Sequence, residues 1–161
     1  MTELNHPFHR HTGVYGICTQ DNRLLVIRKI LGPYTGRYDL PGGRLEKEES
    51  LQEGIIREFR EETGCTVREM NSIGVCDFAL KWYYQGELEI VHHIAMLYEV
   101  SVDANEIRDE VEAFIDQDSN GAIWLPLDEV TEHNASPLVL QAIEWIRSGA
   151  LHVNRQTFDF T

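Results

Sequence analysis

The sequence predicts an α/β (α+β) fold in which a mixed β-sheet is sandwiched between helices, an α/β/α sandwich. Two observations support this prediction. Apolar, β-branched runs of strand length recur along the chain, and two segments carry the four-residue apolar spacing and the end signals of helices. Because strands and helices do not alternate strictly, a mixed sheet is favoured over a doubly wound one. Without a linker in 161 residues, we expect a single domain over 1–161.

The N-terminal part of the chain predicts an arm, a hairpin and a loop. Residues 1–11 are polar and rich in histidine, which favours a flexible arm. The segments 13–19 and 23–30 are apolar and flank the turn-like "QDN", so we expect them to pair as a hairpin. The glycines and prolines of 31–49 indicate a loop.

The clearest helix signal covers 51–63. Ser50 and Glu53 stand in the relation of a capping box, and apolar residues follow at four-residue spacing. Gly64 stands where a helix commonly stops.

The remaining elements follow from the same signals. Long strands are predicted at 65–80 and 88–102, joined by a turn near Gln85-Gly86. A short strand that runs into a turn is expected at 122–130, and Ser136 and Pro137 begin a last helix that ends before Gly149.

The charge balance and the cysteine count argue against several classes of function. Against 27 acidic residues stand 14 Lys and Arg, a formal net charge of −13, which argues against a partner that is a nucleic-acid polymer. A small anionic substrate remains compatible if metal ions neutralise its site. Three cysteines fit neither a disulfide framework nor a zinc site. With no signal-peptide pattern and no membrane-spanning run, we expect a cytoplasmic protein that does not bind membranes.

The stretch "REFREETG" gathers three acids on one side of the predicted helix. Glu58, Glu61 and Glu62 fall within an arc of roughly 100° beside the apolar stripe. Such a group is either a solvated face or a cation site. Glu58 and Glu62 are like charges four residues apart, which favours a cation between them, and we expect Arg57 to point too far round the helix to interleave with the trio. Oxygen ligands beside a Gly-Gly loop suit Mg²⁺ or Mn²⁺.

These residues also form a known spacing. Gly43, then Glu49 after five residues, then "REFREETGC" from Arg57 after seven more, resembles the signature of the Nudix (MutT-type) hydrolases over 23 residues. Phe59 and Cys65 stand where an aliphatic residue is usual. The resemblance implies the Nudix fold and a Mg²⁺-dependent hydrolysis of a diphosphate linkage in a nucleoside diphosphate derivative.

The resemblance also implies roles. Glu58 and Glu62 would be the principal metal ligands, Glu61 a further ligand or a base acting through water, and the carbonyl of Gly42 a backbone ligand. Glu49 and Arg57 would pair to hold the loop against the helix. For a further acid well after the signature, Asp118 is our choice over four rivals, Glu106, Glu110, Glu112 and Asp116.

Substrate contacts are expected from both sides of the loop that contains Gly42 and Gly43, called the glycine loop below. Arg37 and Arg44 are candidates to bind the phosphate groups of the substrate. Tyr38 and Tyr83 are candidates to stack on a base, with Tyr34, Phe78 and Trp82 as further aromatic residues. Adjacent His92 and His93 on a predicted strand would point to opposite faces, so at most one could reach the site.

Several alternatives remain open at the level of sequence. A nucleotide-sensing module without catalysis and an isopentenyl diphosphate isomerase share the fold, but the intact acids argue against both. A dinucleoside polyphosphate hydrolase is suggested only by Tyr83, and the proline typical of ADP-ribose hydrolases is absent from "ALKWYYQ". The expected substrate is a nucleoside triphosphate or a related nucleotide, an oxidised one included, and the protein is expected to be a monomer or homodimer.

Overall fold

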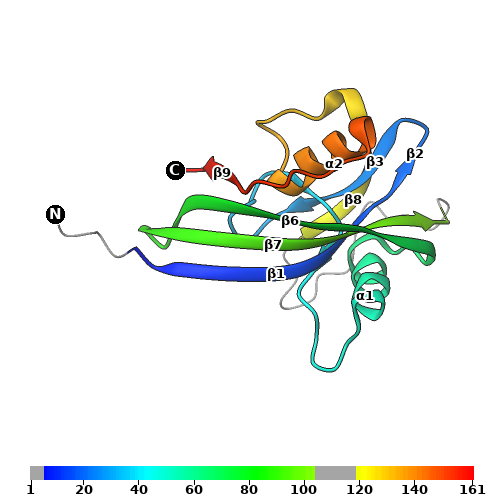
Figure 1. The fold of residues 1–161 in the computed structure, drawn as a ribbon, viewed down its shortest axis with the longest axis horizontal. Coiled ribbons are helices and arrows are strands. Elements are labelled where there is room, and N and C mark those ends of the chain that lie inside the picture. The colour runs from blue at the N-terminus through cyan, green and yellow to red at the C-terminus, as the bar shows by residue number, and fades with distance from the viewer. Residues whose placement is uncertain (1–5, 104–118) are drawn as a thin grey trace.

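The computed structural model describes residues 6–103 and 119–161. Two sheets lie between two α-helices, with α1 and α2 on opposite sides of the strands (Figure 1). The first sheet has the strand order β5-β1-β7-β6-β9; the second has the order β2-β3-β4, with β8 also paired to β3. The elements are β1 (Phe8–Ile17), β2 (Thr19–Gln20), β3 (Arg23–Lys29), β4 (Tyr38–Asp39), β5 (Gly42–Gly43), α1 (Leu51–Thr63), β6 (Val67–Tyr84), β7 (Glu87–Val102), β8 (Ser119–Pro126), a 3₁₀ turn η2 (Leu127–Glu129), α2 (Pro137–Ser148) and β9 (Gln156–Asp159).

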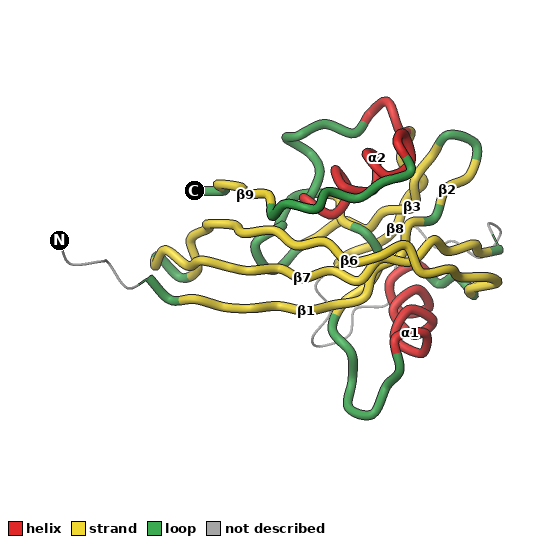
Figure 2. Tube along the Cα trace, in the orientation of Figure 1, coloured by secondary structure: helices red, strands yellow, loops and turns green. Residues whose placement is uncertain are grey.

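The first sheet is mixed, as the sequence predicts. β1 runs parallel to β7, β7 runs antiparallel to β6, and β9 runs parallel to β6. The long hairpin β6–β7 closes through Gln85 and Gly86, whose φ angles of 50° and 81° suit a tight hairpin turn. Figure 2 shows these strands as long neighbouring tubes that extend beyond the helices.

The hydrophobic core consists of two main clusters, one on each face of the strands, because side chains alternate along each strand. On β3, Leu24 and Val26 join the cluster beneath α2, whereas Leu25 and Ile27 join the cluster beneath α1. β1 alternates in the same way. This two-sided burial explains the continuous apolar run of β3, and it confirms the predicted sandwich of a mixed sheet between helices.

Helix α1 has the predicted ends. Ser50 and Glu53 form the complete capping box, and Gly64 adopts the left-handed conformation with φ 76°. Phe59 is fully buried on β1, so tightly that a Cβ added at Gly16 would lie 2.3 Å from its ring. α1 is therefore fixed at short range against β1, the strand that pairs with Gly42 and Gly43.

Two expectations for the N-terminal region are wrong. Residues 8–11 are not a loose arm, because β1 begins at Phe8 and pairs with β7 from Ile90 onward. The predicted hairpin between 13–19 and 23–30 is reduced to the short pair β2–β3 around Asp21 and Asn22. Strand β1 instead joins the other sheet, where a long parallel partner offers it ten paired positions.

The C-terminal region agrees with the prediction and extends it. Ser136 caps α2 and Gly149 ends it with φ 74°. The expected strand at 122–130 appears as β8 followed by η2. β9 is an addition: the sequence analysis assigned no element there, yet residues 156–159 extend the sheet beside β6.

No helix in the described ranges is both long and apolar enough to span a bilayer.

Candidate active site

The glycine loop lies directly on the acidic side of α1. β5 pairs with β1 through Gly42 and Gly43, which brings this backbone to the helix. The Gly42 amide donates a hydrogen bond of 2.8 Å to Oε1 of Glu62. A Cβ added at Gly43 would lie 2.7 Å from Oε1 of Glu58. Only glycine leaves room for this approach, so the loop and the two carboxylates form one surface.

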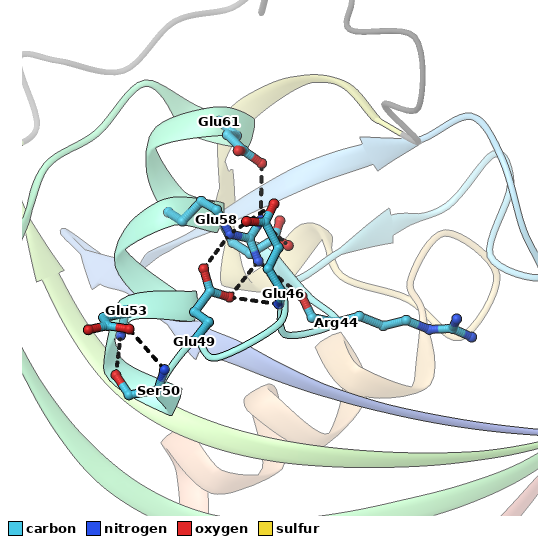
Figure 3. Close-up of polar contacts among 8 residues, drawn as sticks. Arg44, Glu46, Glu49, Ser50, Glu53, Glu58 and Glu61 are labelled. Atoms are coloured by element: carbon cyan, nitrogen blue, oxygen red, sulfur yellow. Dashed lines mark hydrogen bonds and ion pairs between the residues drawn. The ribbon is translucent and has the colours of Figure 1, made fainter.

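Arg57 ties the loop to the helix. Its Nε and Nη2 donate to the two oxygens of Glu49 at 2.6 and 2.8 Å, a bidentate pair. Nη2 also donates to the Arg44 carbonyl at 3.0 Å. The hydrogen bond from Arg57 holds the pKa of Glu49 below its ordinary value. Figure 3 shows Glu46, Glu49, Glu58 and Glu61 turned toward one centre, while the side chain of Arg44 extends the other way.

Arg57 also reaches the acidic trio, contrary to the expectation from helix geometry. Its Nη1 donates to Glu58 at 2.9 Å and to Glu61 at 3.2 Å. The angle between positions on the helix does not decide this contact, because the Arg57 side chain is long enough to reach acids round the helix. The guanidinium therefore partly neutralises the cluster.

Glu58 and Glu62 form the buried part of this cluster. Glu62 is 4% exposed, and burial raises the pKa of Glu58 against the lowering effect of Arg57 and of a hydrogen bond with Glu62. Two carboxylates in contact either share a proton or hold a cation between them. Their oxygen-only chemistry beside a glycine backbone fits Mg²⁺ or Mn²⁺ and not zinc.

The cluster is not preformed as a set of ligands. Within the described residues, no three His, Cys, Asp or Glu side chains converge as a metal group. Glu58 and Glu61 accept from Arg57, and Glu62 accepts from Gly42. Cation binding would therefore draw these carboxylates away from nitrogen partners that now compensate them.

A pocket of about 410 Å³ lies on the far side of the glycine loop. Its lining combines basic, aromatic and acidic side chains, among them Lys29, Arg44, Tyr34, Trp82, Tyr84, His93, Asp39 and Glu89. Tyr15 also lines the pocket. The pKa of its buried hydroxyl is raised chiefly by burial, then by Asp39 and Tyr34, and to a smaller extent by Glu62 and Glu58. Tyr15 is also the register partner of Gly42, so it connects the glycine loop to the pocket.

The predicted substrate residues are only partly brought together. Of the four, Arg44 alone lines this pocket. Arg37 donates to the carbonyls of Glu132 and Ala135 at 2.9 and 3.0 Å and lies over Phe160, so it anchors loops. Tyr38 packs against the core beneath α2. Tyr83 is 58% exposed, whereas its neighbours Trp82 and Tyr84 line the pocket.

Strand alternation explains the position of Tyr83, since its neighbours on β6 point to the other face. Asp118, the chosen acid beyond the signature, lies outside the described residues, as do its rivals at 106–116.

The two adjacent histidines point to opposite faces, as expected for a strand. His92 contacts Asp77 and Arg10, whereas His93 is buried between the hydroxyls of Tyr15 and Tyr34. Sequence reasoning did not assign Tyr15, Lys29 or His11 to the site. The signal for Tyr15 lies in its pairing with Gly42, which only the observed register reveals.

The sequence model of the NUDIX domain matches residues 7–147. The chain belongs to the NUDIX family. The match includes the glycine loop, α1 and all of α2 except its last residue, so the family assignment covers the whole candidate site.

Individual relatives agree with this assignment. The chain is 37% identical over 67 residues to an ADP-ribose pyrophosphatase of Methanocaldococcus jannaschii, covering 42% of this chain and 40% of that relative. It is 27% identical over 147 residues to a MutT-like protein of Streptomyces ambofaciens, covering 91% of this chain and 83% of that protein. The crystal structure of a MutT NUDIX hydrolase from Burkholderia pseudomallei shares the fold, with a TM-score of 0.63 at 24% identity, over 84% of this chain and 96% of that one.

Proposed function

We propose that this NUDIX protein hydrolyses the diphosphate linkage of a nucleoside di- or triphosphate derivative in a reaction that depends on Mg²⁺, or on Mn²⁺ in its place. The observation that carries the proposal is the seating of two carboxylates on the glycine backbone: Glu62 accepts from the Gly42 amide, and Glu58 occupies the space that a Cβ at Gly43 would need. Two like charges this close repel each other, and Arg57 compensates them only in part, so a divalent cation would be bound favourably here. A diphosphate substrate needs such a cation because its own charge would otherwise be repelled.

The residues take the following roles in this proposal. Glu58 and Glu62 hold the metal with the Gly42 carbonyl, and Glu61 is a further ligand or accepts the proton of the attacking water. Asp118 remains the proposed ligand from the later part of the chain. Bound metal supplies charge neutralisation of the phosphate oxygens and a more acidic water. The chain's part is to hold these carboxylates in place, through Arg57 and Glu49, and to orient the substrate.

The substrate is a small-molecule nucleotide. Two considerations bear on its identity and point in different directions. A relative is named an ADP-ribose pyrophosphatase, but the proline typical of ADP-ribose hydrolases is missing from this chain. A panel should therefore contain ADP-ribose, the nucleoside triphosphates, oxidised nucleoside triphosphates and dinucleoside polyphosphates.

Hydrolysis of this panel in Mg²⁺ tests the proposal. We expect release of phosphate or pyrophosphate from at least one compound, with loss of about 10²-fold or more of the rate in Glu58→Gln, since one metal ligand and its charge are lost. Glu53→Gln is the matched control: it removes a carboxylate from the same helix, and glutamine preserves the capping box, so the rate should not change.

Two results would contradict the proposal. If Glu58→Gln were as fast as the parent, the assignment of the acids would be wrong. If no compound of the panel were hydrolysed while one bound tightly, the non-catalytic sensing module would be the better account.

A further inference from the structure

Four hydrogen bonds connect the glycine loop to the wall of the pocket. Arg44 Nε donates to Nδ1 of His11 at 2.7 Å, and Nε2 of His11 lies 3.0 Å from the hydroxyl of Tyr15. The same hydroxyl lies 2.9 Å from Nε2 of His93, whose Nδ1 lies 2.6 Å from the hydroxyl of Tyr34. The five side chains come from β1, β7, the glycine loop and the loop after β3.

The donor-to-acceptor order of these four hydrogen bonds can take only one direction. A guanidinium donates and cannot accept, so Nδ1 of His11 must be the acceptor and its proton must sit on Nε2. His11 then donates to Tyr15, which is left to donate to Nε2 of His93. The proton of neutral His93 must consequently lie on Nδ1, facing Tyr34.

His93 stays neutral in this position. It is 3% exposed, and burial, with the neighbouring charges of His11, Lys29, His92 and Arg44, keeps its pKa well below the ordinary value. The alternative in which His93 carries both protons would also force the Tyr15 hydroxyl to face two donors.

The direction of the chain leaves one hydrogen unused. The Tyr34 hydroxyl accepts from His93, so its own hydrogen must go elsewhere, and no side chain or backbone group of the described residues accepts it. Tyr34 is 4% exposed and lines the pocket. A buried donor without an acceptor costs about 1–3 kcal/mol, which an acceptor entering the pocket would recover.

Two neighbouring aromatic rings line the same pocket. Trp82 and Tyr84 project from β6 with their ring centroids 5.4 Å apart, and both line the cavity. The indole nitrogen of Trp82 donates to Glu89 on β7 at 2.8 Å, which fixes the ring. An aromatic wall beside a directed donor suits a planar heterocycle that carries an acceptor atom.

We propose that this pocket selects the uncleaved end of the substrate through Tyr34, whose hydroxyl donates to a carbonyl oxygen or ring nitrogen of a nucleobase packed against Trp82. Arg44 is then a positioning residue, because it sets the direction of the hydrogen-bond chain that ends at Tyr34. The inference rests on the proposed function, since it assigns the second half of that nucleotide substrate.

Binding of nucleoside monophosphates without metal tests this pocket independently of turnover. For the monophosphate that the parent binds best, Tyr34→Phe should raise Kd about 10-fold, and Trp82→Ala about 5- to 100-fold. Tyr83→Ala removes an aromatic ring from the opposite face of the same strand and should leave Kd unchanged. Ribose 5-phosphate, which lacks a base, should bind equally to all four proteins.

The inference is overturned if Tyr34→Phe and Trp82→Ala bind the monophosphate as the parent does. It is also overturned if Tyr83→Ala weakens binding while Trp82→Ala does not. The same holds if Tyr34→Phe and Trp82→Ala weaken the binding of ribose 5-phosphate as much as that of the nucleotide. A parent that binds through Tyr34 but hydrolyses nothing would contradict the proposed hydrolysis alone. If the parent hydrolyses nucleotides and neither substitution changes Kd, only the proposed role of the pocket is contradicted.

The positioning role of Arg44 has a spectroscopic test. The ¹⁵N shifts of the His93 ring should show the proton on Nδ1 in the parent, and Arg44→Met should move part of the population to Nε2, because Tyr34 can then donate to His93. Arg44→Met should raise Kd about as much as Tyr34→Phe, and the double variant no further. An unchanged tautomer, or effects that multiply, would overturn the positioning role.

Discussion

At the scale of single residues, Arg57 holds the acidic side of α1 together, because it donates to Glu49, Glu58 and Glu61. The positions of Glu58, Glu61 and Glu62 follow from the helical period, and the pairing of Arg57 with Glu49 agrees with the structure. The contacts of Arg57 with Glu58 and Glu61 did not follow, because side-chain direction depends on the loop that fills the other side. The same limit applies to Tyr83 and Trp82, whose faces depend on the register of β6.

His93 makes stability dependent on pH. Its pKa in the folded protein is lowered chiefly by burial, whereas in the unfolded chain it is about 6.5. Below that value the unfolded state binds a proton that the folded state does not, so the contribution is present above the unfolded pKa and is lost as pH falls.

We expect the free energy of unfolding to decrease between pH 6.5 and 5 by up to about 1.4 kcal/mol per pH unit from this group. Urea unfolding at several pH values measures it. His93→Gln should flatten the profile in that window, and His133→Gln, which removes an exposed histidine, should not. A parent and a His93→Gln variant with equal slopes would show that His93 is not the cause.

At the scale of elements, local signals predicted the helices and long-range pairing decided the strands. Ser50, Glu53 and Gly64 define α1 within a short stretch of sequence, so its limits were predictable. The partner of β1 was not, because its parallel neighbour β7 lies about 80 residues away in the chain, as the pairing of Phe8 with Ile90 shows. β9 has no such signal and is recognisable only beside β6.

The seating of α1 on β1 depends on Gly16. A methyl group there would overlap the ring of fully buried Phe59, with atoms 2.3 Å apart. We expect Gly16→Ala to destabilise the fold by about 1–3 kcal/mol through overpacking, measured by urea unfolding.

Adding Phe59→Leu to Gly16→Ala should cost less than the sum of the two single substitutions, because the smaller side chain makes room for the methyl group. If the two effects simply added, the steric explanation would be wrong.

At the scale of the whole molecule, one glycine loop connects the acidic side of α1 with the pocket. Gly42 and Gly43 contact the acids of α1, while the side chain of the next residue, Arg44, begins the chain that reaches the pocket. The family and the layered architecture were predictable from the signature and the pattern of apolar runs. The pocket was not, because its lining comes from β1, β3, β6 and β7, whose relative positions no local pattern specifies.

Mn²⁺ binding followed by electron paramagnetic resonance shows whether the acidic side of α1 is a divalent-cation site, as we propose. The parent should show saturable binding, and the double variant Glu58→Gln/Glu62→Gln should lose at least about 10-fold in affinity because two charged ligands are gone. Glu53→Gln should bind as the parent does. Equal Mn²⁺ affinity in the parent and the double variant, with both correctly folded, would show that Glu58 and Glu62 do not hold the cation.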